Sequence, residues 1–107
     1  MDLEIDVAQA HALLTSPEPP LLLDVREPFE YAIARLEPST HIPMGEIPGR
    51  AHQHVDEDAI TLILCHHGTR SLYVAAWLRQ QGFEKAQSIR GGIEAWAKTI
   101  DPSIPRY

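Results

Sequence analysis

Residues 60–70 read Ile-Thr-Leu-Ile-Leu-Cys-His-His-Gly-Thr-Arg. The apolar run at 60–64 is typical of a central β-strand that is covered on both faces. The polar residues 66–70 include a glycine and suit a tight loop. Apolar residues then recur at helical spacing, at Leu72, Ala75, Ala76 and Leu78. Gly82 follows them and is a typical residue at the end of a helix. The stretch predicts a strand, a loop and a helix, with Cys65 at the carboxyl end of the strand.

The segments on either side repeat the alternation of strand and helix. Helical patterns occupy residues 6–14, 27–33 and 93–97, and short strand patterns occupy 21–23, 40–42 and 83–89. Asp6 and Gln9 form a capping pair at the first helix, and Pro28 occupies the first position of the second. Two segments are predicted without helices, namely the Pro- and Gly-rich residues 37–49 and the polar linker 52–58. The alternation predicts an α/β protein with a parallel sheet, whose ligands bind beyond the carboxyl ends of the strands.

Length and composition narrow the class of protein. A chain of 107 residues is the size of one domain, so residues 1–107 are expected to fold as a single unit. The net charge of −6 and the lack of a basic stripe argue against a nucleic-acid partner. No apolar run approaches the roughly 20 residues that a membrane span needs, and the acidic N-terminus does not resemble a signal peptide. We therefore expect a cytoplasmic protein with no membrane partner.

The loop after the central strand has the residues of an anion-binding site. Backbone amides of residues 65–70 can curl around an anion, and the following helix N-terminus adds partial positive charge. The same field stabilises a thiolate on Cys65, with Arg70 and two histidines as further sources of positive charge. A lone cysteine is often only a small buried hydrophobe, but the polar, glycine-containing surroundings of this one favour a reactive nucleophile.

Three motifs along the chain resemble those of the rhodanese-like domain family. The loop Cys65-His66-His67-Gly68-Thr69-Arg70-Ser71 resembles the family's active-site loop. Leu23-Asp24-Val25-Arg26-Glu27-Pro28 resembles its strand-two signature, and Arg90-Gly91-Gly92-Ile93-Glu94-Ala95-Trp96 its closing motif. Between Ile33 and Gly49 the chain lacks the commoner Gly-His-Ile-Pro-Gly-Ala arrangement, which leaves that loop's shape and its partner preference open.

The resemblance implies a three-layer α/β domain with a central, mostly parallel sheet of about five strands and helices on both faces. It also implies a sulfurtransferase that moves a sulfane sulfur from a donor such as thiosulfate to an acceptor. Cys65 would carry the sulfur as a persulfide. The acceptor could be cyanide, a small thiol or a sulfur-carrier protein. With a single cysteine the chain has no resolving thiol of its own, so an external nucleophile must remove the sulfur.

Two other functions share some of these features. A cysteine phosphatase or arsenate reductase also uses a cysteine loop that ends in arginine, but with five residues between the two, whereas four separate Cys65 from Arg70. The shorter loop favours a sulfur-sized guest. A rhodanese-like module that binds partners or senses redox state without turnover is the other alternative, although such modules often lack the cysteine.

The remaining candidate residues each have two interpretations. The loop residues after Cys65 are assigned to substrate binding, mainly through their backbone amides; they are His66, His67, Gly68, Thr69 and Arg70. The side chain of Arg70 either contacts the anion or pairs with nearby carboxylates. The supporting residues are Asp24, Arg26, Ser71 and Arg90. The first two either act near the site or form an ion network that holds the loops. Arg90 either reaches the opening of the Cys65 loop or stays solvated. Gly91 and Gly92 are expected to permit close approach of the backbone.

Neither a cofactor nor a metal is expected. His52 and His54 together with His66 and His67 match no usual structural zinc spacing, and no second cysteine exists. Trp77 and Trp96 are predicted to pack as anchors and not to stack on a substrate. The oligomeric state is left open, with Met44 and Ile47 as apolar loop residues through which two surfaces could meet.

Overall fold

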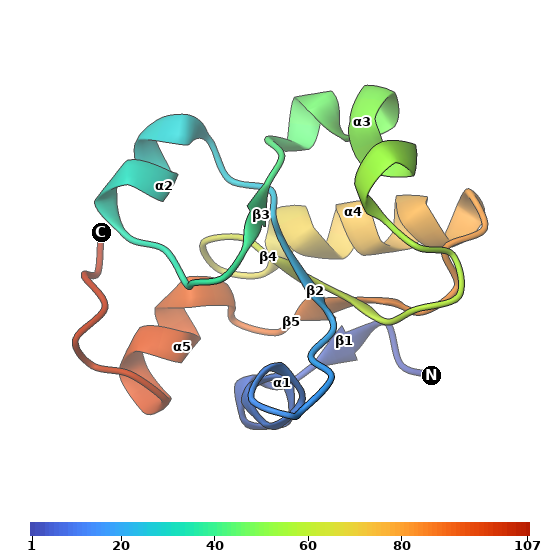
Figure 1. Ribbon diagram of the computed structural model, residues 1–107. Helices are drawn as coiled ribbons and strands as arrows, with labels where there is room; N and C mark the ends of the chain where they lie inside the picture. The colour runs from blue at the N-terminus through green and yellow to red at the C-terminus, as the bar shows by residue number, and fades with distance from the viewer.

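The computed structural model describes all 107 residues and contains one sheet in which every neighbouring pair of strands is parallel (Figure 1). The strands are β1 (Glu4–Ile5), β2 (Leu21–Asp24), β3 (Thr40–His41), β4 (Thr61–Leu64) and β5 (Ala86–Ile89). The helices are α1 (Val7–Leu14), α2 (Pro28–Ile33), α3 (Ile47–His54), α4 (Thr69–Gln80) and α5 (Gly92–Thr99), with a 3₁₀ turn at Met44–Glu46. The predicted α/β class is confirmed.

Both faces of the sheet are covered by helices. Figure 1 shows α3 and α4 on one side and α1 and α5 on the other. Successive side chains of a strand point to opposite faces, so Leu23 and Ile63 join the core beneath α3 and α4, whereas Leu22 and Leu62 join the core beneath α1 and α5. This two-sided burial is why β4 reads as an uninterrupted apolar run. None of the helices combines the length and apolar character that crossing a bilayer requires.

The strand order brings distant parts of the sequence to one edge of the sheet. The order β1-β5-β4-β2-β3 places β4 between β5 and β2, and parallel strands end at the same edge. After β2, the N–H of Val25 donates to the carbonyl of Leu64 across 3.0 Å. After β5, the N–H of Ile93 donates to the carbonyl of Cys65 across 2.9 Å. The three motifs of the sequence thus meet around the end of β4.

Local signals at two helix starts are confirmed. Asp6 Oδ1 accepts a hydrogen bond of 2.7 Å from the N–H of Gln9. Pro28 lies at the start of α2, where the first N–H groups have no partner inside the helix. The N–H of Glu27 is instead satisfied by the carboxylate of Glu30, at 3.0 Å. Capping chemistry therefore located these helix starts correctly.

The prediction that residues 37–49 and 52–58 contain no helix was wrong. Helix α3 begins within the first segment and runs to His54 in the second. It tolerates Pro48 in its first turn, and it buries Ile47 and Ala51, which lie one turn apart on the same face. The structure also has β1, which was not predicted because two residues carry no periodic signal; it pairs with β5 at the sheet edge. The strand predicted at 83–89 begins only at Ala86.

Candidate active site

The sulfur of Cys65 receives hydrogen bonds from the backbone of its own loop. The N–H of Gly68 donates to Sγ across 3.0 Å, and the N–H of Ser71 donates across 3.3 Å. Cys65 is 1% exposed, and its thiol donates to the hydroxyl of Ser71 at 3.3 Å. A cysteine that served only as a core hydrophobe would not need these donors. N–H groups aimed at sulfur stabilise negative charge on it, so the geometry suits a thiolate or a persulfide anion.

Two buried hydroxyl groups stand behind the sulfur. Ser71 Oγ lies 2.7 Å from Ser88 Oγ on β5 and donates to the carbonyl of Gly68 at 3.2 Å. A hydroxyl is both donor and acceptor. Ser71 can therefore accept from the thiol or, after its hydrogen rotates, donate to the thiolate. The pair lets the site hold either charge state of Cys65 without leaving a buried polar group unpaired.

Glycines allow the loop and helix α5 to approach each other closely. Gly68 has φ of 103°, a left-handed conformation that glycine adopts without steric strain, and a Cβ there would lie 3.0 Å from the nitrogen of Gly91. A Cβ on Gly92 would clash with the carbonyl oxygens of Cys65 and His66. Those two carbonyls accept hydrogen bonds from the N–H groups of Ile93 and Glu94, at 2.9 and 3.1 Å. The N-terminus of α5 therefore holds the loop from outside.

The guanidinium of Arg70 is occupied by a carboxylate. It donates two hydrogen bonds to Glu30 of α2, at 2.6 and 2.8 Å. These bonds lower the pKa of Glu30 to about 2, and Glu30 in turn raises the pKa of Arg70. Two roles were considered for Arg70, contact with an anion and pairing with a carboxylate; in the structure its side chain makes the second of these contacts.

A buried ion network continues from this pair beneath the loops. Arg26 and Asp24 are both fully buried and pair across 2.7 Å. Arg26 also donates to the carbonyl of Ala34 at 2.6 Å and to the phenol oxygen of Tyr107 at 2.9 Å. Tyr107 donates to Glu30 at 2.8 Å, and burial raises its pKa to about 12. Asp24 and Arg26 are thus placed as a network that holds the chain segments around the site.

The other candidate residues lie at the rim. His66 stacks between the rings of His67 and Tyr107, with ring centroids 3.8 and 3.9 Å away, and burial together with the charge of His67 lowers its pKa. Thr69 is exposed at the start of α4. Arg90 lies 3.6 Å from Glu4 at the sheet edge and is mostly exposed, so the structure does not bring it to the sulfur.

Sequence reasoning missed several side chains that shape the site. Glu30 and Tyr107 were not singled out, and Ser88 sits inside a predicted strand. Glu30 carried one usable signal, because an acidic residue three positions after Glu27 is typical of a helix start. Nothing local to Tyr107 or Ser88 shows what either contacts. Trp96 is buried in the core as expected for an anchor, while Trp77 is partly buried on the opposite face.

The fold and the loop together define a parallel α/β protein with an amide-lined cysteine at the carboxyl edge of its sheet. Residues 6–99 match the Rhodanese-like domain family, and the chain belongs to that family. A protein of Allochromatium vinosum named "Sulfurtransferase" is 37% identical over 95 residues, which cover 89% of this chain and 88% of that protein.

Two further comparisons show how the domain occurs elsewhere. A rhodanese-like domain protein from Staphylococcus aureus has the same fold, with a TM-score of 0.84 and 26% identity, covering 99% of each chain. "Adenylyltransferase and sulfurtransferase MOCS3-1" of Zea mays is 34% identical over 84% of this chain. Several such relatives are much longer, and this chain spans only 20% to 37% of their length.

Proposed function

We propose that the protein is a sulfurtransferase that carries a sulfane sulfur as a persulfide on Cys65. The observation that carries this proposal is the pair of N–H groups, from Gly68 and Ser71, that donate to the sulfur. Membership of the rhodanese-like family and the relative named sulfurtransferase support the same activity. In this proposal the loop backbone stabilises the sulfur, and Arg70 shapes the loop through Glu30.

The reaction has two half-steps. The thiolate of Cys65 attacks the outer sulfur of a donor such as thiosulfate; a new sulfur–sulfur bond forms, and sulfite leaves with the electron pair of the broken one. The acceptor then attacks the outer sulfur of the persulfide and restores the thiolate, giving thiocyanate when the acceptor is cyanide. Negative charge stays on sulfur throughout, so fixed amide donors assist both half-steps.

The acceptor comes from outside the chain. Cys65 is the only cysteine, so no second thiol can resolve the persulfide internally. A small thiol or a sulfur-carrier protein meets this requirement, with cyanide as an assay acceptor. Because Cys65 is almost fully buried, the outer sulfur of the persulfide is the atom that must be presented to the acceptor.

The test is the intact mass of the purified protein after thiosulfate treatment, before and after cyanide. We expect a gain of one sulfur atom that cyanide removes, and no gain on Cys65→Ser. Other sulfane donors, such as polysulfide, are run in parallel because thiosulfate is only one member of the donor class.

No sulfur gain from any donor, with folded protein and reduced Cys65, would rule out the carrier and favour a binding module. Turnover of a phosphatase substrate in the same samples would favour phosphate ester hydrolysis instead. A gain from polysulfide alone would keep the persulfide carrier and change only the donor.

A further inference from the structure

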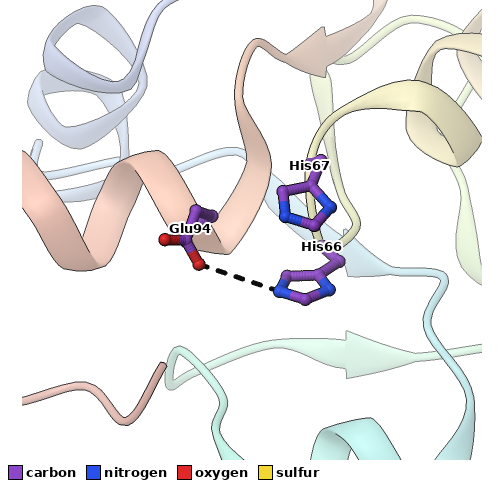
Figure 2. A group of neighbouring side chains, drawn as sticks. All are labelled: His66, His67 and Glu94. Atoms are coloured by element: carbon purple, nitrogen blue, oxygen red, sulfur yellow. Dashed lines mark ion pairs between the residues drawn. The ribbon is translucent and has the colours of Figure 1, made fainter. Parts of the chain in front are cut away.

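His66, His67 and Glu94 form a cluster of potential metal ligands at the rim of the loop. Figure 2 shows the two histidines on the loop after β4 and the carboxylate on the first turn of α5. One potential ligand atom of each residue lies within 4.8 Å of those of the other two. In the sequence Glu94 stands 27 residues after His67, so only the fold assembles this set.

The backbone holds two of these residues together independently of any ion. The N–H of Glu94 donates to the carbonyl of His66 across 3.1 Å, and the neighbouring N–H of Ile93 donates to the carbonyl of Cys65 across 2.9 Å. The His66 ring is packed between His67 and Tyr107. The His66 side chain is therefore kept at the side of Glu94.

One nitrogen of the cluster lacks a partner. Nε2 of His66 is buried and makes no hydrogen bond, although buried polar atoms are paired in the great majority of cases. It lies 3.8 Å from Oε2 of Glu94, beyond hydrogen-bond distance. The other carboxylate oxygen, Oε1, accepts from Arg106 at 2.7 Å and lies 3.7 Å from Lys98. An unpaired nitrogen and the less engaged carboxylate oxygen thus face each other.

We propose that His66, His67 and Glu94 bind a zinc ion. Two histidines and one glutamate are a ligand set that zinc uses when it keeps a fourth position open. Tetrahedral zinc needs ligand atoms about 3.4 Å apart, so the His66–Glu94 pair has to close by only a few tenths of an ångström. The ring of His67 stacks on His66, and its potential ligand atom already lies within 4.8 Å of those of the other two residues, so a small side-chain shift brings it to the ion.

The open position would face a shallow depression beside the cluster. Its volume is about 420 Å³, and it is lined by His67, Glu94, Lys98, Arg106 and Tyr107. Arg106 and Lys98 are cations that share Glu94, so they repel a zinc ion bound there. This opposition makes the site weaker than a structural zinc site and predicts that removing Arg106 strengthens zinc binding.

The test is calorimetric titration of the full chain with zinc chloride, on wild type and on Cys65→Ser, which removes the thiol as a ligand. We expect one zinc per chain in both. Glu94→Gln and His67→Ala should each weaken binding about tenfold or more. His54→Ala, which removes an exposed histidine of α3, is the matched control and should bind as wild type does. Arg106→Gln should bind zinc more tightly.

The proposal is overturned if Cys65→Ser does not bind zinc, or if Glu94→Gln and His67→Ala bind as tightly as wild type. Loss of binding in His54→Ala would also overturn it, because it would assign the ion to surface histidines. A misfolded variant could mimic loss of binding but not the tighter binding expected of Arg106→Gln. Weaker or unchanged binding by that variant would therefore count against the site. These measurements do not depend on sulfur transfer.

Discussion

The two sides of the Cys65 loop handle charge by different means. On the sulfur side, two N–H groups and the hydroxyl of Ser71 contact Sγ, Ser88 is hydrogen-bonded to that hydroxyl, and no charged group makes a hydrogen bond to the sulfur. On the other side, Asp24, Arg26, Glu30 and Arg70 form ion pairs joined through Tyr107. The charged side chains thus neutralise one another, whereas the backbone N–H dipoles of Gly68 and Ser71 act on the sulfur.

This contrast suggests a division of roles. Removing one partner of a buried ion pair strongly destabilises the fold, because it leaves an uncompensated charge in the interior. The charged side should therefore govern whether the loop is held in place. Dipoles fixed by the backbone need no reorganisation when charge moves onto sulfur, so the sulfur side should govern rate. Four substitutions or conditions test this separation.

The largest effect is expected for Asp24→Ala. It leaves the fully buried guanidinium of Arg26 without its carboxylate, and breaking a buried pair costs about 3–5 kcal/mol. Urea unfolding should show the free energy of unfolding falling by that amount. Glu46→Gln breaks the exposed pair with Arg50 and is the control, with an expected loss below about 1 kcal/mol. Equal losses for the two variants would refute the structural role of the buried pair.

Acidification should weaken the charged side through Glu30. Its pKa is about 2 in the folded protein against an ordinary value of 4.5, so the folded state binds the proton less readily than the unfolded state. The resulting stabilisation is fully present above about pH 4.5 and is lost as the pH falls towards 2, to a total of at most about 3 kcal/mol.

Unfolding free energies of wild type and Glu30→Gln, measured across this pH range, check the acid effect. The difference between them should shrink as the pH falls from 4.5 towards 2. A difference that stays constant with pH would mean that the charge of Glu30 is not what stabilises the fold.

On the sulfur side, Gly68→Ala should slow sulfur loading by about tenfold or more, because it displaces an N–H that donates to the sulfur. It should also cost about 1–3 kcal/mol of stability, since alanine is strained at φ of 103°. Gly82→Ala is the matched control: its φ is 101°, with nothing near the added Cβ. The rate of sulfur loading, followed by intact mass, should be normal for Gly82→Ala. If Gly68→Ala and Gly82→Ala are slowed equally, backbone strain in general and not the lost N–H donor explains the effect.

The smallest effect is expected for Tyr107→Phe. It removes the hydroxyl that joins Arg26 to Glu30 but keeps the ring stacked on His66, so the loss should be about 1 kcal/mol. Tyr73→Phe, which alters an exposed tyrosine of α4, should change thermal stability by much less. A clear fall in sulfur loading for Tyr107→Phe without any loss of stability would break the proposed division of roles.

The sequence predicted those parts of the fold that depend on local patterns. The run at 60–64 and the glycines at 68, 91 and 92 fall where the structure has the central strand and the close approach of loop and helix. Helix α3 was missed because its proline and glycine resemble loop residues, although its buried face overrides them. The direction of Arg70 could not be predicted, because its partner is 40 residues away in the chain.

The hold of α5 on the loop has a consequence for peptide rotation. Helix α5 fixes the carbonyls of Cys65 and His66 through the N–H groups of Ile93 and Glu94. In a planar trans peptide, the carbonyl of one residue and the N–H of the next point in opposite directions. Fixing these carbonyls therefore fixes the amides of His66 and His67, which must point away from α5. Neither peptide unit can flip unless α5 moves away. The direction of the N–H groups of His66 and His67 is therefore set by a helix that makes no hydrogen bond to the sulfur.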